Sequence, residues 1–224
     1  MKARLARILL AGMLAASGHA ATARAATGAT PGVAGEASPP AAAVADPVAA
    51  GGAPSEALRA GIFTPPRQAP DFTLRGSDGS DLTLSRYRGK VVILAFGFTS
   101  CPVVCPTTLA VLAEARKELG ADAAGVQVVY VTVDPGRDTA AAMKEFLARF
   151  DPTFVGGTGT EEELAAVRKD YGVDAKKVPA GDSYAYVHSS YTYFIDRQGA
   201  LRALMPYGHP AGDYVHDARI LLSQ

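Results

Sequence analysis

After residue 61, apolar and polar positions follow patterns that predict alternating strands and helices. Short apolar or β-branched runs predict strands at Val91–Phe96, Val126–Val133, Ser183–His188, Tyr191–Ile195 and Leu201–Met205. Alternation on either side of Gly76–Ser80 predicts a hairpin. Apolar residues at helical spacing predict helices that begin near Pro106, Asp138, Thr160 and Ala211.

Local signals mark the ends of several of these helices. Gly120 follows the last apolar position of the first helix, and we expect Asp138 to cap the second. Thr160 and Glu163 form a capping box for the third. Because strands and helices alternate from residue 91 onward, we expect parallel strands joined by helical crossovers.

The order of these elements is similar to the thioredoxin-like arrangement. It comprises a hairpin, a strand, a helix that carries two cysteines, a second strand, further helices, a meander and a final helix. We therefore expect an α/β fold with a central mixed sheet flanked by helices and an N-terminal hairpin extension. Residues 62–224 are long enough for one such domain.

The first 61 residues have a different composition. Residues 1–25 combine Lys2, Arg4 and Arg7 with a short apolar segment and small residues, which predicts a secretory signal peptide. The apolar segment is shorter than the roughly 20 residues that span a bilayer, and an uncleaved anchor stays an alternative. Residues 26–61 are rich in Ala, Pro and Gly, so we expect a disordered linker.

Composition and charge limit the classes of partner. Hydrophobic residues make up 48% of the 224 positions and charged residues 20%, as is typical of a soluble globular domain. Beyond residue 25 the chain has four more acids than bases. This mildly acidic balance argues against nucleic acid as a partner.

The only two cysteines, Cys101 and Cys105, lie between a predicted strand and a predicted helix. The field at a helix N-terminus favours thiolates, so we expect both thiols to be reactive. A structural disulfide, a redox dithiol and a metal site are all possible, although so short a loop gains little stability from a disulfide. Export to an oxidising compartment predicts a Cys101–Cys105 disulfide unless a reductant or a metal holds the pair.

Three separated stretches resemble the Sco/SenC family of thioredoxin-fold copper-delivery proteins. They are Gly97–Leu109 with its CPVVCP core, Val131–Asp138, and Val187–Asp196 with its histidine. The resemblance implies copper, as Cu(I) or Cu(II), bound by Cys101, Cys105 and His188. The predicted export signal separately implies a location in the periplasm or on the outer face of the inner membrane, where a thiol reductant would be needed. The implied acceptor is the copper-centre subunit of cytochrome c oxidase or another periplasmic copper protein.

The ligand chemistry agrees with this resemblance, and the chain also departs from it. Soft thiolates select Cu(I), and imidazole suits either copper valence. Many family members have acidic residues in the CPxxCP interval and before the histidine, where this chain has Val103, Val104 and Val187. Their absence is expected to lower affinity for Cu(II), which prefers harder donors.

Other chemistry-bearing residues have less specific patterns. Asp134 ends a predicted strand and is either a group that tunes His188 or a thiol, or a partner of Arg137 in the turn. We expect His209 and His216 to be surface residues. Met143 and Met205 are at core spacing and are expected to serve packing.

Two functions of different classes fit these residues. The first is a copper metallochaperone for oxidase assembly, and the second is a thiol-disulfide oxidoreductase that acts on the cysteines of a copper-site partner. Reductases of this fold favour a two-residue spacing between the cysteines, whereas this chain has three and a downstream histidine. A peroxidase is disfavoured, because Thr99 lacks the Thr-x-x-Cys spacing to Cys101.

Overall fold

The structure is a computed structural model, and it describes residues 57–224. The strands are β1 (Gly61–Gln68), β2 (Thr73–Gly76), β3 (Asp81–Thr83), β4 (Val91–Gly97), β5 (Val126–Thr132), β6 (Val155–Thr158), β7 (Ala175–Ala180), β8 (Ser183–His188), β9 (Tyr191–Ile195) and β10 (Ala200–Pro206). The helices are α1 (Val104–Leu119), α2 (Ala140–Leu147), α3 (Glu161–Tyr171) and α4 (Ala211–Leu222), with 3-10 turns at Leu84–Tyr87 and Gly120–Gly125.

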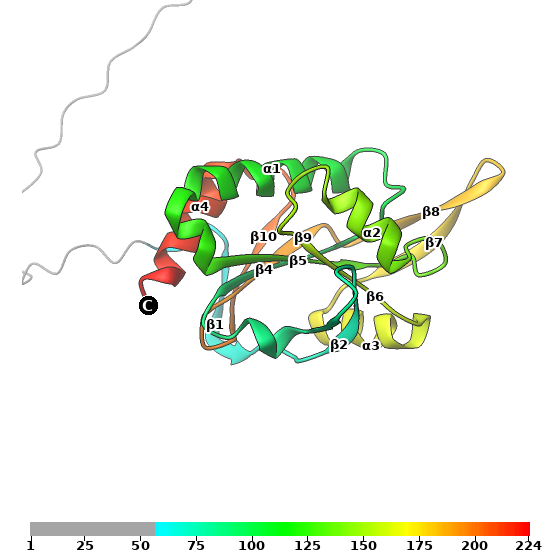
Figure 1. Ribbon diagram of the computed structural model, residues 1–224. Coiled ribbons are helices and arrows are strands. Elements are labelled where there is room, and N and C mark those ends of the chain that lie inside the picture. The colour runs from blue at the N-terminus through cyan, green and yellow to red at the C-terminus, as the bar shows by residue number, and fades with distance from the viewer. Residues whose placement is uncertain (1–56) are drawn as a thin grey trace, which may run out of the picture. The chain divides into compact units, whose positions relative to one another are not determined.

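Eight strands form a central mixed sheet in the order β1-β10-β9-β4-β5-β6-β2-β3. The pairs β4–β5 and β5–β6 are parallel, as the alternation of strands and helices predicted, and the other pairs are antiparallel. The two central strands β4 and β5 are buried along their whole length. Figure 1 shows this sheet with the N-terminal hairpin β2–β3 at one edge, which confirms the expected fold class.

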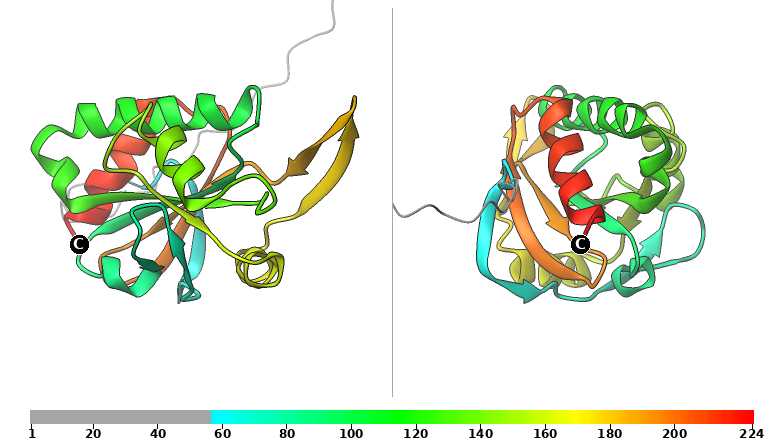
Figure 2. Two further views of the ribbon diagram at one scale, coloured as in Figure 1. Left: turned by 45° about the vertical axis from the view of Figure 1, so that its right-hand side comes forward. Right: turned by 90° about the vertical axis from the view of Figure 1, so that its left-hand side faces the viewer.

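Helices cover both faces of the sheet. Figure 1 shows α1 and α4 on one face and α3 on the other, and the end view in Figure 2 agrees. Successive residues of β9 point to opposite faces: Thr192 bonds the Tyr214 hydroxyl of α4, and the Tyr193 hydroxyl donates to the Tyr171 carbonyl at the end of α3. The core therefore has two layers, with the sheet between them.

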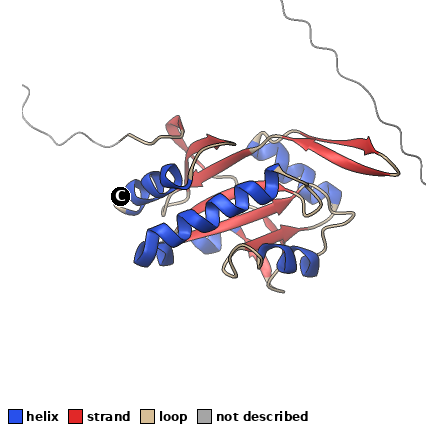
Figure 3. Cartoon of the chain, turned by 90° about the horizontal axis from the view of Figure 1, so that it is seen from above, coloured by secondary structure: helices blue, strands red, loops and turns tan. Residues whose placement is uncertain are grey.

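Strands β7 and β8 form a separate two-stranded hairpin. It projects from the rest of the fold in Figures 2 and 3. At its base, the Ser189 amide donates to the Asp174 carbonyl at 2.9 Å. Since β8 ends at His188 and β9 begins at Tyr191, the hairpin positions this histidine beside the central sheet.

Two predicted helix starts need correction. Helix α1 begins at Val104, two residues before the predicted start at Pro106. The cap of α2 is Thr139, whose side chain accepts from the Ala142 amide, and not Asp138. Asp138 cannot serve as the cap because its carboxylate is buried in other hydrogen bonds. The capping box of Thr160 and Glu163 is confirmed.

The predicted signal peptide, residues 1–25, lies outside the described residues, as does most of the predicted linker. Residues 58–61, which the sequence analysis placed in the linker, instead belong to the fold: Ala60 is buried, and β1 begins at Gly61. Helices long and apolar enough to cross a membrane are absent from residues 57–224.

Candidate metal centre

The two cysteines lie where β4 passes into α1. Cys101 is in the connecting loop and Cys105 is in the first turn of the helix. Val103 at the N-cap offers no side-chain hydrogen bond to the helix; the Cys105 amide instead donates to Cys101 Sγ at 3.4 Å. The Cys101 thiol therefore satisfies one of the amides that a helix start leaves without an intrahelical partner.

Cys105 is a buried thiol. It is 3% exposed, and burial, followed by the contact with Cys101, raises its pKa to about 12. The expectation that the helix N-terminus makes both thiols reactive is wrong for Cys105, because the loss of hydration outweighs the helix field. In the metal-free protein at neutral pH this thiol keeps its proton.

His188 lies against Cys105 although 83 residues separate them. Its Nε2 is 3.7 Å from Cys105 Sγ, and its Nδ1 is 2.9 Å from the Ser189 carbonyl oxygen. Because a carbonyl only accepts, Nδ1 carries the proton and Nε2 directs its lone pair toward the sulfur. Burial lowers the pKa of His188, so the imidazole is neutral at pH 7 and ready to bind a metal.

The three predicted ligands thus lie close together in the fold, but they are not arranged around a common position for an ion. Within residues 57–224, no three His, Cys, Asp or Glu side chains are grouped as around a bound ion. Both cysteines are free thiols here. The Cys101–Cys105 disulfide therefore stays a prediction about the oxidised protein. Cys105 and His188 already contact each other, and the Cys101 sulfur contacts the Cys105 amide.

The surface around these residues is apolar where the family resemblance suggested acids. Val103 is 59% exposed and Val187 is 65% exposed. Val104 is partly buried on α1. The aromatic ring of Phe98 meets His188 edge to face, with 6.0 Å between ring centroids. None of these three valine positions therefore contributes a carboxylate near the candidate ligands.

Asp138 anchors the loop that carries Cys101. It is completely buried, and its carboxylate accepts from the Thr99 amide at 2.9 Å, the Thr99 hydroxyl at 2.6 Å and the Thr132 hydroxyl at 2.6 Å. These contacts join the loop after β4 to the end of β5. The sequence signal for this role was weak, because an Asp before a helix is more often a cap.

Asp134 takes the second of the two roles considered from the sequence. Its carboxylate pairs with the Arg137 guanidinium and accepts from the Tyr184 hydroxyl at 3.0 Å. The Arg137 side chain also lies over the Tyr184 ring, 4.0 Å from its centroid. Asp134 therefore ties the turn after β5 to the β7–β8 hairpin, and a tuning role for it stays a prediction.

Tyr130 and Gly97 belong to the site although the sequence analysis did not select them. Tyr130 is on β5, directed toward Cys105, and it is 1% exposed. A Cβ atom on Gly97 would be 2.0 Å from the Tyr130 hydroxyl and 2.8 Å from Cys105 Sγ. Only glycine leaves room for these two groups to approach the backbone of β4. An isolated Tyr in an apolar strand gave no sign of this.

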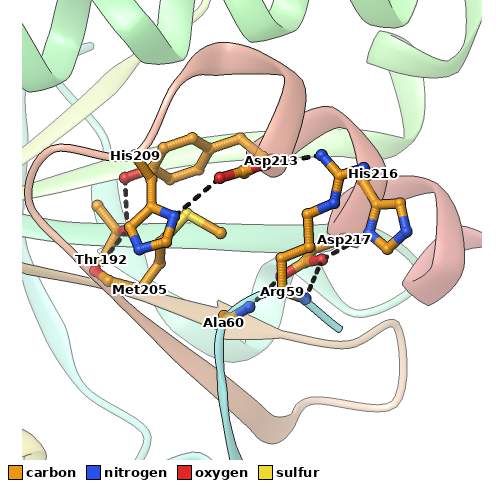
Figure 4. Close-up of polar contacts among 9 residues, drawn as sticks. Arg59, Ala60, Thr192, Met205, His209, Asp213, His216 and Asp217 are labelled. Atoms are coloured by element: carbon orange, nitrogen blue, oxygen red, sulfur yellow. Dashed lines mark hydrogen bonds and ion pairs between the residues drawn. The ribbon is translucent and has the colours of Figure 1, made fainter. Parts of the chain in front are cut away.

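The two other histidines of the described part lie on or beside α4. His209 Nδ1 is 2.8 Å from Asp213 and His216 Nδ1 is 2.9 Å from Asp217, as Figure 4 shows. Both histidines are partly buried and paired, which corrects the expectation of plain surface residues. Met143 and Met205 are completely buried, which confirms their packing role.

Comparison with known proteins identifies the family. The sequence profile of SCO1/SenC matches residues 63–223. The chain is 37% identical to the SCO2-like protein of Rickettsia conorii over 132 residues, which are 58% of this chain and 64% of that protein. It is 36% identical to the mitochondrial SCO2 homologue of Bos taurus over 58% of this chain and 50% of that one. The matches thus span about half to two thirds of the length of these relatives.

Solved structures agree with the fold. Copper-bound ScoI of Bradyrhizobium japonicum is 35% identical, with a TM-score of 0.65 over 69% of this chain and 99% of that chain. Copper-bound Sco1 of yeast is 30% identical, with a TM-score of 0.60 over 67% and 85%. The apo Sco1 protein of Thermus thermophilus is 31% identical, with a TM-score of 0.66 over 77% and 100%. The chain therefore belongs to the SCO1/SenC family.

Proposed function

We propose that this protein is an exported copper metallochaperone that binds copper through Cys101, Cys105 and His188. It delivers the ion to the binuclear copper site of cytochrome c oxidase. The observation that carries the proposal is the contact between His188 Nε2 and Cys105 Sγ, which brings distant parts of the chain to one point. The likeness to copper-bound structures of the family supports the choice of metal.

The donor set fits a copper ion as cargo. Two sulfurs and one imidazole are ligands that copper prefers in its reduced state, and imidazole also suits the oxidised state. His188 is neutral, so only the thiols must lose protons when the ion binds. Copper thereby overcomes the high pKa of Cys105, because a bound metal favours the thiolate far more than burial disfavours it.

A three-ligand site also suits transfer. Closed four-ligand sites are the structural kind, whereas a site with an open position can accept an incoming ligand. Cys101 is partly exposed at the start of α1, so it marks the open side of the site. An acceptor would replace the ligands one at a time, beginning with Cys101.

Copper titration of the reduced protein tests the ligand set. The wild type should bind about one copper ion, since the site has a single set of donors. The His188→Ala variant should bind copper much more weakly, whereas His209→Ala, which removes an imidazole paired with Asp213, should bind like the wild type. Equal titration curves for both variants would contradict the assignment of His188.

The location and the partner are further parts of the proposal. Residues 1–25 support export, and the linker, which ends before residue 58, would let residues 58–224 reach an acceptor in the periplasm or at the outer face of the inner membrane. The acceptor is a copper-centre subunit or another periplasmic copper protein. A thiol reductant must keep the cysteines reduced before they bind copper.

A second candidate function, thiol-disulfide exchange, is favoured by the geometry of Cys101. Its sulfur accepts a helix-start amide and is partly exposed, as an attacking thiolate requires. Cys101 would attack a partner disulfide and release one partner thiolate. Cys105 would then pass its proton to His188 Nε2, 3.7 Å from its sulfur, attack Cys101 and release the second partner thiolate. Two electrons pass to the partner, and the Cys101–Cys105 disulfide remains for a reductant to reduce.

One anaerobic experiment separates the two functions. Copper-loaded protein and metal-free reduced protein are each mixed with a metal-free copper-centre domain, whose cysteines are supplied either reduced or as a disulfide. Transfer of copper to the reduced domain supports the chaperone. Reduction of the disulfide by metal-free protein, without copper transfer in the other mixture, supports the oxidoreductase and contradicts delivery.

A further inference from the structure

The hydroxyl of Tyr130 is a buried polar group that the proposed ligand set does not use. Within residues 57–224 no hydrogen bond of ordinary geometry reaches this oxygen, and the Cys105 thiol lies close enough for each group to shift the pKa of the other. Its side chain comes from β5, the strand parallel to β4, and lies beneath the first turn of α1. A buried hydroxyl without a partner costs about 1–3 kcal/mol, so its presence calls for a reason.

The thiol of Cys105 lies close to this hydroxyl. Both atoms border the space that a side chain on Gly97 would fill, at 2.0 Å and 2.8 Å from its Cβ position. Tyr130, Cys105 and His188 also line one small cavity. Burial and then the contact with Cys101 raise the pKa of Cys105, and the Tyr130 hydroxyl opposes them, as a donor that faces the sulfur should.

We propose that Tyr130 is a positioning residue that donates a hydrogen bond to the Cys105 sulfur when this sulfur binds a metal as a thiolate. The inference rests on the proposed ligand set. A thiol is a weak acceptor, which explains an unpartnered hydroxyl in the metal-free protein, and a thiolate is a strong one. Metal binding thus gives the hydroxyl the partner that it lacks.

This donor acts on the site in two ways. It fixes the direction of the Cys105 sulfur, which also contacts His188 Nε2 at 3.7 Å. It also withdraws electron density from the thiolate, as groups around a ligand commonly do. Since the hydroxyl gains a strong acceptor only in the metal-bound state, part of the affinity for metal comes from Tyr130.

The Tyr130→Phe variant tests this role because it removes one oxygen and keeps the ring. The matched control is Tyr193→Phe, which removes a buried hydroxyl that is already bonded to the Tyr171 carbonyl at 2.9 Å. Both variants and the wild type are reduced and loaded anaerobically with Cu(II). The readouts are the sulfur-to-copper charge-transfer absorption and the affinity for copper in competition with a chelator.

In Tyr130→Phe we expect the charge-transfer band to move to lower energy and copper affinity to fall about tenfold, the effect of one hydrogen bond to a charged group. Tyr193→Phe should leave both unchanged. Metal-free Tyr130→Phe should unfold at the same temperature as the wild type or higher, because only a weak contact with a neutral thiol is lost, whereas Tyr193→Phe should unfold at a lower temperature.

The possible failures are distinguishable. An unchanged band and affinity in Tyr130→Phe would overturn the role of Tyr130 and leave the ligand set intact. A strongly destabilised metal-free Tyr130→Phe would also overturn it, because the hydroxyl would already have a partner. A wild-type complex without any sulfur-to-copper band would overturn the proposed ligand set itself.

Discussion

At the scale of single residues, the two thiols differ in ways that the sequence alone does not reveal. Cys101 is partly exposed and accepts the Cys105 amide, whereas Cys105 is buried with a pKa raised to about 12. The field of the helix N-terminus predicted that both thiols would be reactive. The difference arises because the helix turns Cys105 toward the sheet and leaves Cys101 in the loop.

The raised pKa of Cys105 predicts a loss of stability at alkaline pH. The unfolded thiol ionises near its ordinary value of 9.0, while the folded thiol keeps its proton to about 12. Between these values the folded state binds more protons, so the free energy of unfolding falls as pH rises, by up to about 1.4 kcal/mol per pH unit.

Urea unfolding of reduced, metal-free protein at several pH values measures this effect. The Cys105→Ser variant lacks the ionisable thiol, so its stability relative to the wild type should improve steadily from pH 9 upward. The comparison with the variant cancels the tyrosines and lysines that titrate in the same range. A constant difference between the two proteins across this range would contradict the buried, protonated thiol.

His188 has the opposite pH dependence. Burial lowers its pKa in the folded state, so the unfolded state binds more protons as pH falls below 6.5. The metal-free wild type should therefore lose stability between pH 6.5 and the lower folded pKa, and His188→Gln should lack that part of the loss. NMR titration of the imidazole in metal-free protein provides the check; a pKa above 6.5 would argue against this burial.

At the scale of elements, the strongest tie of the site is Asp138. Its buried carboxylate holds the loop after β4 through Thr99 and the end of β5 through Thr132. Three hydrogen-bond donors point at this carboxylate. The side-chain amide of an asparagine here would place its own N–H groups against some of these donors. The loop of Cys101 thus depends on the charge and geometry of one side chain.

The Asp138→Asn variant should lose about 2–4 kcal/mol of stability, since buried donors would lack an acceptor. The matched control is Asp122→Asn, whose carboxylate pairs with Arg219 while both side chains are more than half exposed; its effect should be under about 1 kcal/mol. Denaturant unfolding compares the two. Similar effects for both variants would show that Asp138 is not an anchor.

Most elements could be predicted from the sequence, and the exceptions share a physical cause. The buried strands β4 and β5 and the helix α4 were found because their apolar patterns are long and regular. The strands β1, β6 and β7 were not predicted. β6 has two glycines in four residues, and β1 and β7 contain prolines and charged side chains and are largely exposed. Such strands are fixed by their neighbours more than by their own pattern.

At the scale of the whole folded unit, residues at the start of the described chain are hydrogen-bonded to helix α4 near its end. Asp217 is completely buried, and its carboxylate accepts from the Arg59 amide at 2.8 Å and the Ala60 amide at 2.9 Å, next to His216. Figure 4 shows these contacts beside the Asp213 pair. The start of the described chain is thereby tied to its last helix, just before β1 joins the sheet edge.

The Asp217→Asn variant should destabilise the protein by about 2–4 kcal/mol and expose residues near Ala60 to protease, because backbone donors would lose a charged acceptor. Asp213→Asn is the matched control on the same helix. Its carboxylate pairs with Arg59, which is half exposed, and with His209, which is about one third exposed, so its loss should cost about 1 kcal/mol, less than the loss of the buried Asp217. Limited proteolysis and thermal unfolding measure both. If Asp217→Asn and Asp213→Asn resisted protease equally, the result would contradict the role of Asp217 in holding the chain near Ala60.

The candidate site illustrates what a sequence can and cannot give at this scale. The motif around the cysteines and the downstream histidine predicted which residues meet, because family resemblance carries such pairings. The depth of Cys105, the hydroxyl of Tyr130 and the anchor at Asp138 depend on how β4, β5 and α1 pack. Local patterns contain little of that information, since each contact joins separate elements.

The central claim is that two sulfurs and one imidazole hold a single copper ion. X-ray absorption of the copper-loaded, reduced protein tests it most directly. We predict sulfur scatterers from Cys101 and Cys105 together with the multiple-scattering signature of one imidazole, and loss of that signature in His188→Ala but not in His209→Ala. A copper ion surrounded only by nitrogen and oxygen, or an imidazole signal unchanged in His188→Ala, would contradict the account.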